Sequence, residues 1–96
     1  MGNTLGKEES TNMTDEEFDI IDELYFVTSY QDLKEGCQFS DEILQSNLVS
    51  LIENGLVRVY KDVDEASEME DVNLKDHFRD YFYLASKKGL FEHNSK

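Results

Sequence analysis

The sequence predicts a small α+β domain in which three helices precede a two- or three-stranded antiparallel sheet. Apolar residues recur with helical spacing through the first half of the chain, and residues typical of helix starts and stops bracket those segments. Two short segments, 56–61 and 81–85, instead combine alternating or β-prone apolar side chains, as strands do. A chain of 96 residues has room for one domain with one small core.

The first helix is predicted to begin at Thr14. Residues 1–12 are mostly polar and are expected to form a flexible tail, which leaves 13–96 for the domain. Thr14 can accept a hydrogen bond from the third helical residue, Glu17, whose side chain can return one, and this reciprocal pattern is a capping box. The apolar side chains that follow have helical spacing: Phe18, Ile20, Ile21, Leu24, Tyr25 and Val27.

A second, shorter helix is expected after Ser29, which can cap its first turn. Leu33 and Cys37 are four residues apart and therefore share one face of this helix. Gly36 is expected to end it in a left-handed conformation, because glycine adopts positive φ without a steric penalty.

The third helix is predicted from about residue 41 to residue 54. Phe39 and Leu44 flank the capping residue Ser40 at the positions of a hydrophobic staple, and Gly55 supplies the stop. A stripe of apolar side chains with helical spacing should face the core: Leu44, Leu48, Leu51 and Ile52.

The remaining chain predicts two strands joined by a long acidic loop. In the first strand Val57 and Val59 should face one side, and Leu56, Arg58 and Tyr60 the other. Residues 62–80 carry eight acids against Lys75 and Arg79. So polar a stretch is expected to be a solvated loop, with room for one helical turn around 74–78. Segment 81–85 can then pair antiparallel with the first strand.

The segments DEILQSNLVSLIENGLVRVYKD and YFYLASKKGL give this chain a resemblance to winged helix-turn-helix domains of the MarR and PadR type. The order of helix, short helix, helix, strand, long loop and strand is that of the family. The resemblance implies that the third helix is the recognition helix and that the loop 62–80 is the wing. It does not fix the function, because winged helices serve both as DNA readers and as protein-interaction modules.

The charge of the chain argues against DNA. The formal net charge is −13, from 22 acids and 9 bases, and it repels phosphate backbones as well as anionic membrane surfaces. No Lys or Arg occurs between Glu35 and Val57, although a recognition helix needs cations for phosphates and hydrogen-bonding side chains for base edges. Folding can still gather a group of scattered cations into a patch: Arg58, Lys61, Arg79, Lys87 and Lys88.

No residue pattern in the sequence points to catalysis, a cofactor or a metal. Cys37 fits a buried structural thiol, and His77 and His93 fit surface residues better than metal ligands. Segment 62–73 resembles a calcium loop only in its acids, because its sixth position is Ser67 where such a loop requires glycine. The chain is therefore expected not to be an enzyme.

Two functions remain open. The first is a non-enzymatic winged-helix-like module that binds a protein partner or another copy of itself. Such a module would act as a regulator. The alternative is a small DNA-binding transcriptional regulator. With neither a signal peptide pattern nor a long apolar run, a cytoplasmic protein that does not bind membranes is expected. The candidate interaction face combines the outward side of the third helix with two tyrosines: Glu42, Ser46, Val49, Ser50, Glu53, Tyr60 and Tyr81.

Overall fold

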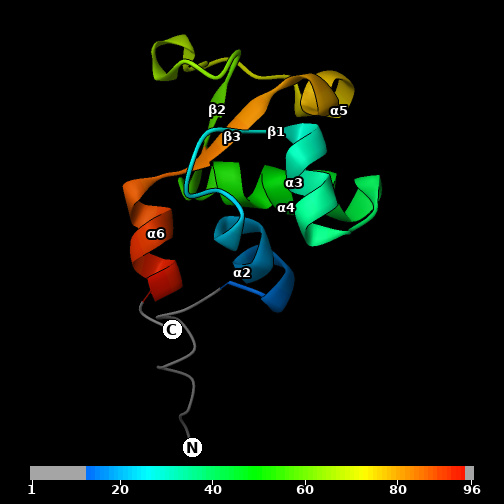
Figure 1. The fold of residues 1–96 in the computed structure, drawn as a ribbon, viewed down its shortest axis with the longest axis vertical. Coiled ribbons are helices and arrows are strands. Elements are labelled where there is room, and N and C mark those ends of the chain that lie inside the picture. Colours follow the sequence, from blue (N-terminus) through cyan, green and yellow to red (C-terminus); the bar gives the residue numbers. More distant parts are fainter. Residues whose placement is uncertain (1–12, 95–96) are drawn as a thin grey trace, which may run out of the picture.

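The computed structural model describes residues 13–94, which form five α-helices and one three-stranded antiparallel sheet (Figure 1). The predicted tail, 1–12, lies outside the described residues. The elements follow one another as α2 (Asp15–Asp22), β1 (Thr28–Ser29), α3 (Tyr30–Cys37), α4 (Asp41–Glu53), β2 (Val57–Tyr60), α5 (Leu74–His77), β3 (Phe82–Ala85) and α6 (Lys87–Asn94). Two 3₁₀ turns, η1 (Glu65–Ser67) and η2 (Phe78–Asp80), complete the list.

The α+β class is therefore confirmed, and the number of helices was underestimated. The three predicted helices are α2, α3 and α4, but α5 and α6 are also present. Both are short, at four and eight residues. Their sequences lack the long apolar stripe that reveals a helix in advance.

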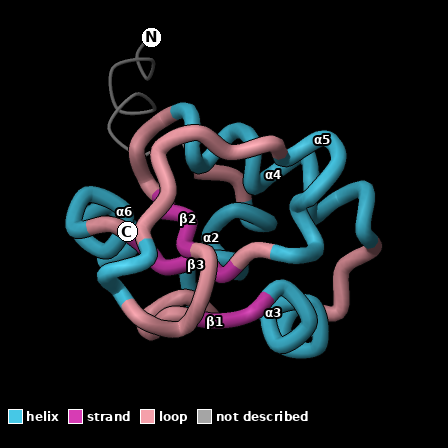
Figure 2. Tube along the Cα trace, turned by 90° about the horizontal axis from the view of Figure 1, so that it is seen from above, coloured by secondary structure: helices cyan, strands magenta, loops and turns pink. Residues whose placement is uncertain are grey.

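The sheet has the strand order β1-β3-β2, with β3 paired antiparallel to both neighbours. Val59 of β2 lies opposite Tyr83 of β3, and Thr28 of β1 lies opposite the same tyrosine. Seen from above, α6 and α3 lie at opposite ends of this sheet (Figure 2). The sheet thus links the C-terminal helix to the region around α3.

The predicted helix starts are confirmed by their hydrogen bonds. Thr14 Oγ1 accepts from the Glu17 amide at 3.1 Å, and the Thr14 amide donates back to Glu17 Oε1 at 3.0 Å. Ser29 and Ser40 cap α3 and α4 in the same manner. These bonds satisfy amides that a helix start otherwise leaves without partners.

The predicted end of α4 is confirmed, and the predicted end of α3 is not. Gly55 ends α4 with φ of 75°, and the amides of Gly55 and Leu56 donate to Ile52 and Leu51 as a Schellman motif requires. The predicted stop at Gly36 is wrong, because α3 continues to Cys37 and Gln38 takes the left-handed conformation, with φ of 61°. A Cβ on Gly36 would meet only the flexible end of the exposed Glu23 side chain.

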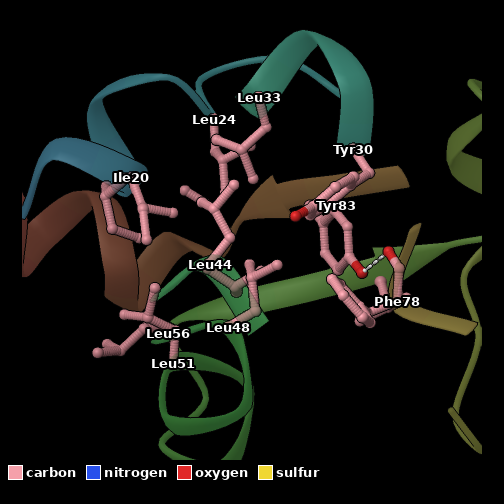
Figure 3. Packing of buried hydrophobic residues seen from close by; sticks show 14 of the residues in the cluster. Ile20, Leu24, Tyr30, Leu33, Leu44, Leu48, Leu51, Leu56, Phe78 and Tyr83 are labelled. Atoms are coloured by element: carbon pink, nitrogen blue, oxygen red, sulfur yellow. Dashed lines mark hydrogen bonds between the residues drawn. The ribbon is translucent and has the colours of Figure 1, made fainter. Parts of the chain in front are cut away.

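The core lies between the sheet and helices α2, α3 and α4 (Figure 3). Leu44, Leu48 and Leu51 of α4 are fully buried, as predicted, and Ile52 is partly buried. Tyr83 is the largest fully buried side chain, and its hydroxyl donates to the Phe78 carbonyl at 2.6 Å (Figure 3). This bond satisfies a buried polar group that would otherwise weaken the core.

The acidic loop is more ordered than predicted. Most of its side chains are exposed, but Glu68 forms a β-bridge with Tyr60, and the Met69 amide donates to the Val59 carbonyl. The loop therefore folds back along β2, and later forms α5 and η2. Tyr60, which forms this bridge, is buried.

Helix α6 approaches the backbone of the turn between α4 and β2 closely. Ser86, the residue before it, accepts a hydrogen bond from the Gly89 amide and donates one to the Gly55 carbonyl. Gly89 lies against the Leu56 carbonyl so closely that no Cβ would fit. The C-terminal helix is thus fixed to the turn between α4 and β2.

Candidate functional site

The predicted interaction face of α4 is acidic at both ends. Glu42 and Glu53 are exposed at its two ends, Ser46 is exposed between them, and Val49 and Ser50 are half-buried. The resulting surface offers carboxylates and hydroxyls, and none of the described cations lies on this helix. Carboxylates would face the phosphates of a docked duplex and would repel them.

Helix α5 lies across part of α4. The side-chain amide of Gln45 donates to the carbonyls of Leu74 and Lys75, at 2.9 Å and 3.3 Å. In Figure 2 both α4 and α5 lie on the same side of the sheet. Gln45 thus holds α5 beside α4, while Glu42, Ser46 and Glu53 on its outer side stay exposed.

Tyr60 and Tyr81 do not extend this face as expected. Tyr60 is only 3% exposed, because the returning loop covers it. Tyr81 is half-buried, and its hydroxyl accepts a hydrogen bond from the Asn73 amide at 2.9 Å. The expectation that these two rings are exposed contacts is therefore wrong for Tyr60 and only partly met for Tyr81.

The five candidate cations line different hollows of the surface or none. Arg58 and Lys87 line one hollow beside the sheet, Lys88 lines a second, and Arg79 lines a third. Lys61 follows β2 and lines none of the three. Arg58 Nη1 also donates to both carboxylate oxygens of Glu68, at 3.1 Å and 3.2 Å, so its charge is compensated locally.

Asp41 lies at the centre of a polar network that the sequence did not predict. Asp41 Oδ1 accepts from the Tyr30 hydroxyl at 2.6 Å and from Lys34 Nζ at 2.9 Å, and Oδ2 lies 3.4 Å from Arg79 Nη2. Tyr30 and Lys34 are four residues apart on α3, and Asp41 begins α4. Arg79 comes from η2, and no sequence signal joins it to residues 38 or more positions earlier.

This network changes the acid–base properties of two groups. The Tyr30 hydroxyl, followed by Lys34, holds the pKa of the Asp41 carboxyl at about 2. Burial, together with the hydrogen bond to Asp41, raises the pKa of Tyr30 far above its usual value. At neutral pH Asp41 is therefore ionised, and Tyr30 is a neutral hydrogen-bond donor.

An open hollow of about 530 Å³ lies over this cluster. Its lining comes from α3, the start of α4 and η2, and comprises Tyr30, Gln31, Lys34, Glu35, Asp41 and Arg79. Beneath it the Tyr30 ring packs edge-on against Phe78 at 5.2 Å, and the Arg79 guanidinium lies 4.6 Å above the same Phe78 ring. In Figure 3, Tyr30, Tyr83 and Phe78 gather at one end of the core.

The cysteine and the histidines occupy structural environments. Cys37 is half-buried, and burial, followed by the nearby carboxylates of Glu23, Asp19 and Asp22, raises its thiol pKa to about 11. The thiol therefore stays protonated and is a poor nucleophile at neutral pH. His77 lies on the surface as predicted, 3.4 Å from Asp80.

His93 was predicted to lie on the surface, and this prediction is wrong because its side chain is only 9% exposed. The ring stacks on Phe18 at 4.1 Å, and Nδ1 lies 2.9 Å from the Tyr25 hydroxyl. Nε2 is buried and makes no aligned hydrogen bond, although Asp22 Oδ1 is 3.5 Å away. His93 thus helps to fix α6 against α2.

Two large apolar side chains are the most exposed of their kind. Phe26, in the segment between α2 and β1, is 81% exposed, and Phe91 of α6 is 74% exposed.

The described residues contain neither a candidate membrane-spanning helix nor a metal-ligand cluster. Among residues 13–94, no helix has the length and apolar character to span a membrane, and no three His, Cys, Asp or Glu side chains cluster as metal ligands would. Compared with protein-family models, curated proteins and solved structures, the chain matches none of them.

Proposed function

We propose that this chain is a non-enzymatic winged-helix-like module that acts through protein–protein interaction, with a regulatory role. The order of its elements supports the winged-helix part of the proposal. A helix, a short strand, two helices and two strands follow one another, and the sheet order β1-β3-β2 places the short first strand beside the last. In this proposal α4 corresponds to the recognition helix, and the loop 62–80 to the wing.

The observation that carries the interaction part is that α4 is acidic on its outer side and contacts α5. Its outer side bears Glu42 and Glu53, and Gln45 holds α5 against it. Both features oppose entry into a DNA groove, the first through charge and the second through sterics. A protein partner with cationic or hydrogen-bonding groups meets neither obstacle.

A DNA-binding transcriptional regulator is the second candidate. The observation in its favour is the shared hollow of Arg58 and Lys87 beside the sheet, where a wing would approach a duplex. Against it, Glu65 lines the same hollow, and Glu68 already pairs with Arg58. One compensated and one exposed cation contribute little counterion release.

A direct titration separates these two functions. The full chain is titrated with a pool of mixed-sequence DNA duplexes at about 150 mM salt, where the screening length is about 8 Å. We expect no binding in the micromolar range. A sub-micromolar, sequence-selective dissociation constant would establish the regulator and refute the interaction module. Sedimentation of the same sample over a range of concentrations then reports whether the partner is a second copy.

A further inference from the structure

We propose that the hollow over Asp41 binds the C-terminal carboxylate of a partner protein. This inference rests on the proposed function, since it names the chemistry by which a protein partner is held. The hollow of about 530 Å³ is within the range of ordinary ligand sites, which is about 300–1,000 Å³. Its lining combines an aromatic ring, two cations and two hydrogen-bonding side chains at its rim.

The cations retain donors for a ligand. Lys34 uses one of its three protons on Asp41, and its side chain is 42% exposed. Arg79 approaches Asp41 only at 3.4 Å, beyond the usual length of such a bond, and no other described residue accepts a hydrogen bond from it. Most of the guanidinium fork therefore remains available, and this fork matches a carboxylate in shape.

Asp41 and Phe78 hold these donors in position. The Asp41 carboxylate, which is itself fixed by the Tyr30 hydroxyl, lies between Lys34 and Arg79. The Phe78 ring supports the flat side of the guanidinium. Preorganised donors bind with a smaller entropic loss than mobile surface side chains do.

The charges around the hollow disfavour a doubly charged ligand more than a singly charged one. Lys34 and Arg79 are balanced by Asp41 and Glu35, so the lining as a whole is neutral. A phosphate dianion would meet two carboxylates here, in a chain whose net charge is already −13. A carboxylate brings half of that charge and fits the two cations with less repulsion.

The acceptors at the rim favour a peptide end over a lone carboxylate. Gln31 and Glu35 line the hollow on α3, and the Gln31 amide donates to Glu35 at 3.3 Å. Their oxygens can accept the backbone N–H groups that lie just before the terminal carboxylate of a peptide.

The test uses the full chain and peptides that differ only at their end. Amide shifts of Tyr30, Gln31, Lys34 and Arg79 are followed by NMR during titration with an acetylated pentapeptide pool that has free C-terminal carboxylates. The same pool with amidated ends, and inorganic phosphate, are titrated in parallel. We expect dissociation constants on the order of 1 mM for the free-ended pool, as is usual for short flexible ligands. The amidated pool and phosphate should leave these signals unchanged.

Matched variants assign the effect to the hollow. Arg79→Gln should weaken binding by about tenfold or more, because charge-assisted hydrogen bonds are lost. Lys61→Gln removes the same charge outside the hollow and should bind as the wild type does. Equal binding of amidated peptides, tighter binding of phosphate, or no shifts at these residues would overturn the inference. None of those results bears on the proposed function, which fails only in the duplex DNA titration.

Discussion

At the scale of single residues, Asp41 shows how one carboxylate can organise three elements. It begins α4, yet its oxygens contact a tyrosine and a lysine of α3 and an arginine of η2. Solvent screens ion pairs at the surface, so the clearest effect of the network is on where these side chains lie.

The first prediction concerns the pKa of Asp41. Its largest cause is the Tyr30 hydroxyl, so Tyr30→Phe should raise that pKa from about 2 toward the ordinary value of about 3.9. Lys34→Met should raise it by less. Carboxyl ¹³C shifts measured against pH report both values, and the order of the two variants is the discriminating result.

The same shift has a consequence for acid stability. Because the folded pKa lies below the unfolded one, Asp41 stabilises the fold above about pH 4, and this contribution is lost as the pH falls toward 2. In Tyr30→Phe the melting temperature should therefore depend less on pH between 4 and 2. An unchanged pH dependence would show that Asp41 is not coupled to folding through Tyr30.

The second prediction concerns the core. Leu48 is fully buried on α4, and Leu48→Ala should lower the free energy of unfolding by roughly 2–5 kcal/mol. Ile43, on the same helix but 36% exposed, is the matched control, and Ile43→Ala should cost clearly less. Chemical denaturation of both variants measures the two costs, and equal values would mean that α4 does not pack through Leu48.

At the scale of the elements, the sequence predicted where helices begin better than where they end. It also did not predict that the acidic loop folds back along β2. Thr14, Ser29 and Ser40 cap their helices because these caps depend on contacts within one turn. The burial of Tyr60 depends on a loop that returns to β2 through Glu68 and Met69, and the local alternation of side chains carries no trace of it.

In the candidate site too, local spacing predicted some residues correctly, and tertiary contacts set the others. Helical spacing placed Glu42, Ser46 and Glu53 on the outer side of α4, where the structure has them exposed. Arg79 reaches Asp41 only because η2 follows α5 and lies against α3, so the hollow could not be predicted from spacing. Short elements with few apolar residues, such as α5, are set by tertiary contacts and give weak sequence signals.

The third prediction concerns how α6 is docked. A Cβ on Gly89 would clash with the Leu56 carbonyl oxygen, which belongs to the backbone and cannot rotate away. Gly89→Ala should therefore push α6 off the turn between α4 and β2 and speed amide exchange throughout α6. Gly55→Ala is the comparison, since it meets no atom within 4 Å and only its positive φ is strained, at a cost of about 1 kcal/mol. Gly89→Ala should be the more destabilising variant, and the reverse order in thermal melts would contradict this packing.

At the scale of the whole molecule, charge decides which partners can approach. The net charge of −13 on 96 residues acts at long range, while the carboxylates of α4 act at the surface where a duplex would dock. These two effects predict different behaviour when charges are moved. A long-range effect depends only on the total charge, whereas a local one depends on where each charge lies.

The last prediction separates the two effects by placing the same charge change at two positions. Glu42→Lys with Glu53→Lys shifts the net charge by about +4 on α4, and Glu16→Lys with Asp19→Lys makes the same shift on the exposed side of α2. If α4 is a winged-helix recognition helix whose surface has the wrong sign for DNA, only the first pair should gain duplex binding, and that binding should weaken steeply with salt. Fluorescence anisotropy with a labelled duplex at 50 and 150 mM salt measures both. Equal gains would assign the barrier to total charge. No gain from the α4 pair would indicate that α5, held by Gln45, is the barrier, and adding Gln45→Ala to that pair should then release it.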